Sequence, residues 1–217
     1  LALGKGVYVC DSRKEARQAL HLLMVDRIHG EAGERVIIEK YLAGFELSIH
    51  ALSDDKDAAF FPASRDYKRL GDGNTGPNTG GMGAITSAEF GQFLMDGIRE
   101  DIANPALAAL CERGSPFVGC FYPGIMLTKN GPMALEFNAR FGDPETQCYM
   151  RILKSDLLDL IEACINGTIA SQSIEWEPRA CVSVVLASEG YPYVLSFFMP
   201  EPPTMKRKNS SHRAAAC

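Results

Sequence analysis

Residues 135–145 bring three acids, an amide and an arginine into one short stretch, Leu-Glu-Phe-Asn-Ala-Arg-Phe-Gly-Asp-Pro-Glu. An Asn-Gly pair at 130–131 stands upstream between two apolar runs and predicts a hairpin turn, whose return strand carries Glu136 and Asn138. Side chains two apart on a strand share a face, so a carboxylate and an amide oxygen project together. Such hard oxygen donors suit Mg²⁺, which is often shared with nucleotide phosphates. Because Arg140 and Asp143 follow closely, we interpret the stretch as a metal and phosphate site; for the pair alone, a solvated strand end is the alternative.

A glycine-rich segment at residues 72–84 is the second candidate. It contains five glycines, and a basic cluster at 65–69, Arg-Asp-Tyr-Lys-Arg, precedes it. Glycines let backbone N–H groups converge on an anion, while Lys68 and Arg69 supply charge-assisted contacts to phosphate or carboxylate. A flexible linker is the alternative, although Gly/Ser linkers rarely contain a basic cluster and a Pro-Asn-Thr segment. We therefore expect a loop that binds an anion.

Weaker signals lie nearer the N-terminus. Gly4-Lys5-Gly6 is a short glycine motif without the length of a P-loop or its Ser or Thr, and the chain has no dinucleotide-binding fingerprint. Residues 39–42 could offer backbone groups of a strand edge to a base and Glu46 a carboxylate to a ribose, with solvated strand glutamates as the plainer interpretation. The four histidines are dispersed, and no Ser-His-Asp or Cys-His signature is present, which disfavours a hydrolase.

The composition is that of an ordinary globular protein. The 217 residues are 46% hydrophobic and 23% charged, with a formal charge of -5 that argues against a protein built mainly to hold nucleic acid. Seven cysteines include no C-x-x-C pair and lie mostly in apolar runs, which indicates a reducing compartment. No signal peptide or membrane-spanning run is evident, so we expect a cytosolic protein without a membrane partner.

The elements that must position the candidate residues alternate between hairpins and helices, which predicts an α+β or mixed α/β domain. The spacing of Ser12 and Glu15 is that of a capping box that opens a helix to about residue 27. In the strand predicted at 45–52, Glu46, Ser48 and His50 share one face. The other predicted elements are strands at 7–10, 35–41 and 58–62, a helical region at 87–112 that breaks near Pro105, a hairpin at 117–138, a helix at 149–166 and a buried strand at 179–188.

Three segments lack a periodic pattern. Residues 64–84 predict a long loop, and a loop of this length in a compact domain is usually functional. Gly4-Lys5-Gly6 would normally follow a strand, so we expect further sequence upstream. Residues 193–217 form a separate segment with a basic, serine-rich and alanine-rich end that we expect to be disordered.

Taken together and in order, the motifs resemble one family. They are Gly4-Lys5-Gly6-Val7, Val36-Ile37-Ile38-Glu39, Gly44-Phe45-Glu46-Leu47-Ser48, Lys68-Arg69, the glycine-rich run at 76–84 and the acidic run at 135–145. The family is phosphoribosylamine-glycine ligase, or glycinamide ribonucleotide synthetase, of the ATP-grasp superfamily, and the similarity covers about residues 2–192. In animals this domain usually opens a trifunctional purine-synthesis protein, so we expect the chain to be a piece of one, with the other purine-synthesis domains as partners.

The resemblance implies a partial ATP-grasp domain over 1–192, with antiparallel sheets and packed helices, and an aberrant tail over 193–217. It implies that glycine carboxylate attacks the γ-phosphate of ATP and that phosphoribosylamine captures the acyl phosphate, giving glycinamide ribonucleotide, ADP and phosphate. The implied cofactors are ATP and Mg²⁺ or Mn²⁺.

The resemblance also assigns roles to individual residues. The metal ligands would be Glu136 and Asn138. The nucleotide would be held by Lys5, Gly6, Glu39, Leu42 and Glu46. Phosphoribosylamine and glycine would be held by Asp66, Lys68, Arg69, Asn78, Thr79, Gly80, Arg140 and Asp143, of which Lys68, Arg140 and Asp143 would be catalytic.

The chain departs from the family pattern at two kinds of position. The usual Gln-Asp-His-Lys-Arg is replaced by Arg65-Asp66-Tyr67-Lys68-Arg69, and from Tyr193 onward the sequence matches no part of the family pattern. These departures leave two alternatives open. One is an ATP-grasp ligase for another carboxylate or amine, and the other is a truncated, inactive fragment that serves as a binding module.

Overall fold

The computed structural model describes residues 6–192. The chain divides into two compact units, Leu1–Ala43 and Gly44–Cys217. The prediction for 193–217 lies outside the described residues. Within 6–192, no helix is both long and apolar enough to cross a membrane.

The first unit is a short helical segment. Helix α1 (Arg13–Leu20) begins where the sequence predicts it, because Ser12 Oγ accepts from Glu15 N at 3.2 Å, while Glu15 Oε2 accepts from Asp11 N at 2.9 Å. The helix continues into the π-helical turn η1 (His21–Val25), and the 3-10 turn η2 (Gly30–Glu34) follows. The strands predicted at 7–10 and 35–41 are wrong: both segments are irregular. A strand needs a neighbour for its backbone hydrogen bonds, and the described part of this unit provides none.

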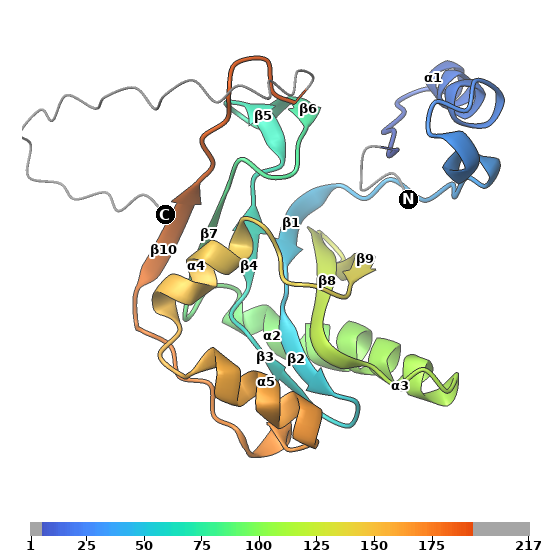
Figure 1. Cartoon of the computed structure of the whole chain (residues 1–217). Helices are drawn as coiled ribbons and strands as arrows, with labels where there is room; N and C mark the ends of the chain where they lie inside the picture. The colour runs from blue at the N-terminus through green and yellow to red at the C-terminus, as the bar shows by residue number, and fades with distance from the viewer. Residues whose placement is uncertain (1–5, 193–217) are drawn as a thin grey trace, which may run out of the picture. The chain divides into compact units, whose positions relative to one another are not determined.

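The second unit is built on an antiparallel sheet in the order β10-β7-β4-β1-β8-β2-β3, with β9 paired to β8 (Figure 1). Strand β8 is long enough to pair with β1 along one half and with β2 along the other. The strands are β1 (Gly44–Ser48), β2 (Ala51–Asp54), β3 (Ala58–Phe60), β4 (Ser64–Asp66), β7 (Gly83–Ser87), β8 (Val118–Thr128), β9 (Gly131–Asn138) and β10 (Ala180–Val184), and a separate hairpin is formed by β5 (Arg69–Gly71) and β6 (Thr75–Asn78).

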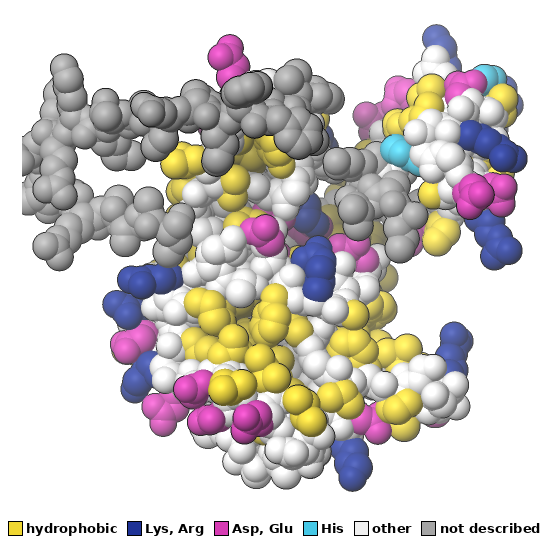
Figure 2. All heavy atoms as spheres, in the orientation of Figure 1, with side chains coloured by type: hydrophobic (Ala, Val, Ile, Leu, Met, Phe, Trp, Pro, Cys, Tyr) yellow, Lys and Arg dark blue, Asp and Glu magenta, His cyan; other side chains and the backbone are white. Residues whose placement is uncertain are grey.

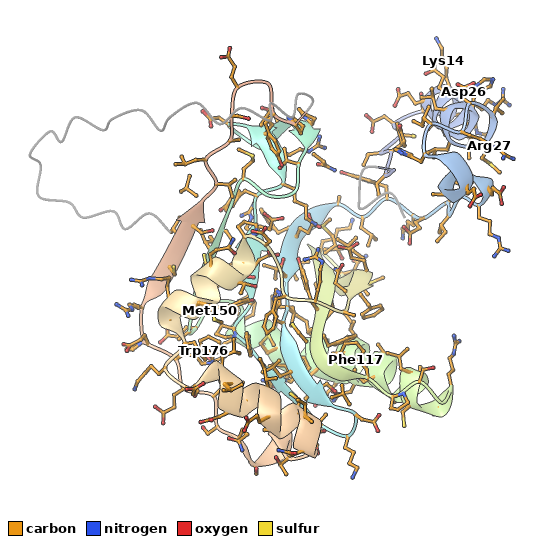
Figure 3. The ribbon with its side chains drawn as sticks, in the orientation of Figure 1. Lys14, Asp26, Arg27, Phe117, Met150 and Trp176 are labelled. Atoms are coloured by element: carbon orange, nitrogen blue, oxygen red, sulfur yellow. The ribbon has the colours of Figure 1, made fainter. Side chains whose placement is uncertain are left out.

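Helices pack on both faces of this sheet (Figure 1). On one face, α4 (Glu145–Ile152), α5 (Leu157–Asn166) and the 3-10 turn η5 (Ile169–Ser171) enclose a core that includes Phe61, Tyr149 and Leu160. Trp176, labelled in Figure 3, packs edge-on against Phe61 with ring centroids 5.0 Å apart. On the other face, η3 (Gln92–Leu94), α2 (Met95–Ile98) and the π-helical turn η4 (Arg99–Ala103) cover a second core, and α3 (Asn104–Glu112) continues from η4.

The predicted class, α+β with antiparallel sheets, is confirmed. The hairpin at 117–138 and the strand near 58–62 are confirmed as well. The break predicted near Pro105 is wrong: helical residues run without interruption from 95 to 112, and Pro105 lies in the first turn of α3, directly after the π-helical turn η4. Three other predictions are wrong in detail. Residues 64–84 are not a loop throughout, because they contain β4 and the β5–β6 hairpin, and the single helix predicted at 149–166 is two helices. The strand predicted to be buried at 179–188 is β10, an edge strand with exposed apolar side chains. The strand at 45–52 is interrupted at 49–50.

Candidate active site

Strands β1 and β4 of the second unit, with the short segment that follows β4, bring Glu46, Asp66 and Lys68 together. Lys68 Nζ donates to Glu46 Oε1 at 2.5 Å, and both side chains are about one-third exposed, at 31% and 35%. Burial acts to lower the pKa of Lys68, but Glu46, Asp66 and Glu136 outweigh it and the net shift is upward. Lys68 is therefore held in its charged form by the acidic side chains around it.

Asp66 is the group in this cluster with the most perturbed titration. Its pKa rises from 3.8 to about 7, chiefly through burial and then through the charges of Glu145 and Glu46, while Lys68 acts in the opposite direction. Its Oδ1 atom is buried without a hydrogen-bond partner. A carboxyl group with a pKa near neutrality is a candidate for proton transfer in a functional site.

Strand β9 places Glu136 and Asn138 on one face, as predicted from their spacing. Asn138 Nδ2 donates to Glu136 Oε1 at 3.1 Å. Among the described residues, no three His, Cys, Asp or Glu side chains gather as a metal cluster. The pair offers two oxygen donors, which fits an ion that keeps several waters and shares phosphate oxygens, as Mg²⁺ does.

The glycine-rich segment folds back on the loop after β9. Thr79 N and Oγ1 both donate to Lys68 O, at 2.7 and 2.9 Å. Gly81 has a φ of +130°, and a Cβ there would lie 2.5 Å from Pro144 Cδ and 2.9 Å from Asp66 Oδ1. The close approach requires glycine at this position. The segment is thus an ordered part of the site rather than a flexible linker.

Most of the other sequence-predicted substrate residues lie beside these groups. Arg69 pairs with Asn78 across the β5–β6 hairpin, and its Nη1 donates to Gly76 O at 2.6 Å. Gly80 N donates to the Tyr191 hydroxyl at 3.2 Å. Asp143 Oδ1 accepts from Gln147 Nε2 at 2.7 Å in the first turn of α4.

A buried polar network under the loop at 139–145 was not predicted from the sequence. Glu145 is 1% exposed, and its Oε1 accepts from both Ser48 Oγ and Tyr122 Oη at 2.6 Å. Burying a carboxylate without such donors would be costly. Because Ser48 of β1 and Tyr122 of β8 donate to Glu145, these hydrogen bonds fix the start of α4 against the sheet.

The two departures from the family pattern, Arg65 and Tyr67, form part of a stack. The Arg65 guanidinium lies 5.2 Å from the ring centroid of Phe45 and 4.9 Å from that of Tyr67. Alternation along β1 and β4 directs Phe45 and Arg65 to the face opposite Glu46 and Asp66. Arg65 therefore does not enter the Glu46–Lys68 cluster.

The predicted nucleotide residues are divided between the two units. Lys5 lies outside the described residues. Gly6, Glu39 and Leu42 belong to the first unit, where Glu39 is exposed and Leu42 is half-buried. Of the predicted nucleotide set, Glu46 is the member that lies in the second unit.

The antiparallel sheet, with acid, amide and basic side chains gathered over one end, belongs to an ATP-grasp domain. The chain belongs to the family described as phosphoribosylglycinamide synthetase, ATP-grasp (A) domain, whose model matches residues 1–146.

Curated relatives and solved structures agree with this assignment. The chain is 46% identical over 194 residues to the trifunctional purine biosynthetic protein adenosine-3 of Gallus gallus, covering 88% of this chain and 19% of that protein. It is 43% identical over 193 residues to a phosphoribosylamine–glycine ligase of Caldanaerobacter subterraneus, covering 88% and 46%. A crystal structure of phosphoribosylamine–glycine ligase from Thermotoga maritima superposes with a TM-score of 0.74 at 35% identity, covering 88% of this chain and 48% of that one. The chain thus spans about half the length of these ligases.

Proposed function

We propose that this chain carries the substrate and metal residues of a phosphoribosylamine–glycine ligase, which joins glycine to phosphoribosylamine at the expense of ATP. The observation that carries the proposal is the gathering of Glu46, Asp66, Lys68 and Glu136 over one end of the sheet, together with membership of the family. The parent protein would supply further purine-synthesis domains, and the setting would be the cytosol.

The proposed reaction has two steps and requires a bound metal ion. Glycine carboxylate is a poor electrophile, so its oxygen first attacks the γ-phosphorus of ATP and ADP leaves; the amine of phosphoribosylamine then attacks the acyl carbon, and phosphate leaves. Glu136 and Asn138 would hold Mg²⁺ or Mn²⁺, which when bound neutralises charge on the transferring phosphoryl group.

The side chains around the metal pair would hold and orient the substrates. Lys68, Arg69 and Arg140 would hold anionic oxygens, and Asn78, Thr79, Gly80 and Asp143 would orient the amine substrate. The amine loses a proton as it forms the amide, and the carboxyl group of Asp66, with its pKa near 7, is suited to accept it. Glu46 would contact the ribose of ATP, and Lys5, Gly6, Glu39 and Leu42 would complete the nucleotide site.

The test is formation of glycinamide ribonucleotide from labelled glycine, ATP and phosphoribosylamine, in the longest natural protein that contains this sequence. Lys68→Met is expected to lower kcat/KM by about 100-fold or more, because it removes a cation from the site. Lys129→Met is the matched control, since Lys129 is exposed in the turn between β8 and β9 and should leave activity unchanged. Absence of product from the unmodified protein would contradict the proposal.

A second function is favoured by one observation, the replacement at Arg65 and Tyr67. The protein would then be an ATP-grasp ligase for another carboxylate. ADP release measured with a series of carboxylates separates the two functions, because the first requires glycine to be preferred. The stacking of Arg65 with Phe45 and Tyr67 on the opposite face supports glycine.

A further inference from the structure

His50 is a buried histidine to which the proposed reaction gives no role. It lies between β1 and β2, is 0% exposed, and touches the loop at 139–145 through a ring nitrogen. His50 Nε2 accepts from Gly142 N at 2.9 Å, and Nδ1 lies 3.2 Å from Tyr149 Oη. Both ring nitrogens are thus used.

These contacts fix the protonation state of the ring. A backbone N–H can only donate, so Nε2 carries no proton, and the neutral ring must then carry its proton on Nδ1 and donate it to Tyr149 Oη. Tyr149 in turn has its own proton for Pro62 O at 3.0 Å or Ser64 Oγ at 2.8 Å. The arrangement requires a neutral imidazole, and burial, reinforced by Arg140, lowers the pKa of His50 to about 3.

The His50 ring and Arg140 both contact Tyr122. His50 stacks on Tyr122 with ring centroids 4.1 Å apart and an interplanar angle of 21°, and the Arg140 guanidinium lies 5.6 Å from the Tyr122 ring centroid. A Cβ at Gly142 would lie 2.8 Å from His50 Nε2 and 2.6 Å from Glu145 Oε2. Gly142, between Arg140 and Asp143 in the chain, is thereby held against the imidazole with no room for a side chain.

We propose that His50 is a positioning residue: by accepting from the Gly142 N–H and stacking under Tyr122, it holds the 139–143 loop so that Arg140 and Asp143 meet the substrate. The inference rests on the proposed function, which places substrate at these two residues. His50 itself touches no substrate. Its removal should release the loop without touching the residues that hold the nucleotide.

Three variants separate positioning from simple packing. His50→Gln keeps an amide oxygen that can accept from Gly142 N–H, whereas His50→Phe keeps the ring stack and loses the acceptor. Tyr149→Phe removes the hydroxyl partner of Nδ1 and leaves the Gly142 contact in place. If His50 only fills space, His50→Phe should be the mildest of the three.

The first readout, amide hydrogen exchange by NMR, is independent of catalysis. In the unmodified chain we expect Gly142 N–H to be protected and the His50 ring nitrogens to show the Nδ1–H tautomer at neutral pH. His50→Phe should speed exchange at Gly142 by about tenfold or more, because the amide loses its acceptor, while His50→Gln and Tyr149→Phe should retain most of the protection. Unchanged Gly142 exchange in His50→Phe would overturn the proposal. If His50→Phe does not fold, Gly142 exchange in His50→Gln equal to that of an unprotected amide would overturn it as well.

The second readout is ligase kinetics. His50→Phe should raise the KM for phosphoribosylamine by about tenfold and leave the KM for ATP within about twofold, and His50→Gln should restore most of the loss. Equal changes in both KM values would instead mean a general structural defect and would overturn the positioning role. A protein that makes no product at all refutes the proposed function, and the exchange measurement still decides whether His50 holds Gly142.

Discussion

Asp66 holds a buried carboxyl oxygen without a hydrogen-bond partner, next to the Lys68–Glu46 ion pair. An ionised carboxylate is disfavoured there, so the folded chain binds a proton at Asp66 more tightly than the unfolded chain does. A substrate ammonium group or a bound cation would relieve this cost. The ionised form of Asp66 is thus destabilising in the folded chain, as charged groups at functional sites often are.

This environment predicts a pH dependence of stability. Because the pKa of Asp66 rises from 3.8 to about 7, its contribution makes the free energy of unfolding fall as pH increases from about 4 to 7. Asp66→Asn has no ionisation to lose, so its stability relative to the unmodified chain should increase over the same range. Urea unfolding at several pH values measures this. Asp72→Asn, at an exposed turn residue, is the matched control, and parallel curves for Asp66→Asn and the unmodified chain would contradict the assignment.

Sequence patterns located some of these residues better than others. Alternation along residues 45–52 correctly places Glu46, Ser48 and His50 on one face, and the spacing of Glu136 and Asn138 does the same for β9. The partners of Ser48 and His50 could not be found this way, because Tyr122 and Tyr149 are 74 and 99 residues away in the chain. In the sequence, Tyr122 lies in an apolar strand and is indistinguishable from a core residue; its hydrogen bond to Glu145 is visible only in the folded structure.

At the scale of elements, strong local signals were reliable. The Asn-Gly turn joins β8 to β9, with Gly131 at a φ of +108°, and the Ser12 cap starts α1. The errors come from tertiary context. Strands β4, β5 and β6 are only three or four residues long, too short for a periodic pattern to appear. The break between α4 and α5 follows from Asp156, whose side chain accepts from Leu158 N at 2.8 Å and caps a new helix.

Asp54 joins two elements that are distant in the sequence. Its Oδ1 accepts from Lys56 N and Asp57 N in the β2–β3 turn, and its Oδ2 accepts from Ile169 N at 3.0 Å in η5. Burial acts to raise the pKa of Asp54, but these backbone donors outweigh it and lower the pKa. The stabilisation is therefore present above the unfolded pKa of 3.8 and is lost as pH falls through the lower folded value.

Asp54→Ala should lower the free energy of unfolding by about 2–4 kcal/mol at pH 7, because three N–H groups lose their acceptor. The measurement is denaturant unfolding by circular dichroism. Asp57→Ala, at an exposed position in the same turn, should change stability by no more than about 0.5 kcal/mol. Similar losses in both variants would mean that the turn, and not the link to η5, carries the effect.

At the scale of the whole molecule, the described part of the second unit, residues 44–192, exposes several large apolar side chains. Figure 2 shows apolar side chains gathered over the α4 and α5 region of the visible face, with acidic side chains along its lower margin. Exposed large residues there include Met150 (labelled in Figure 3), Leu158 and Ile165, and β10 exposes Val182 and Val184. Relatives about twice as long have additional chain that could cover such surface.

The stability of the chain with and without Mg-ATP tests how much of the nucleotide site this chain forms. A ligand that binds only the folded state stabilises it by RT ln(1 + [L]/Kd), which is about 2.7 kcal/mol when the ligand is at 100 times its Kd. We expect Mg-ATP to raise the melting temperature of the 217-residue chain, measured by calorimetry, and ATP with EDTA to raise it less. Glu136→Ala should abolish the difference between the two, because the metal loses a carboxylate ligand.

Glu112→Ala is the matched control for the metal residue, since Glu112 is exposed at the end of α3, away from β9. This control should keep the full Mg²⁺-dependent shift. A Mg²⁺-dependent shift in melting temperature of equal size in the unmodified chain and in Glu136→Ala would mean that the metal does not bind at β9. A cooperative transition with no shift in any of the proteins would mean that Glu46 and Glu136 do not bind Mg-ATP in this chain alone, and that binding depends on the additional chain that the longer relatives contain.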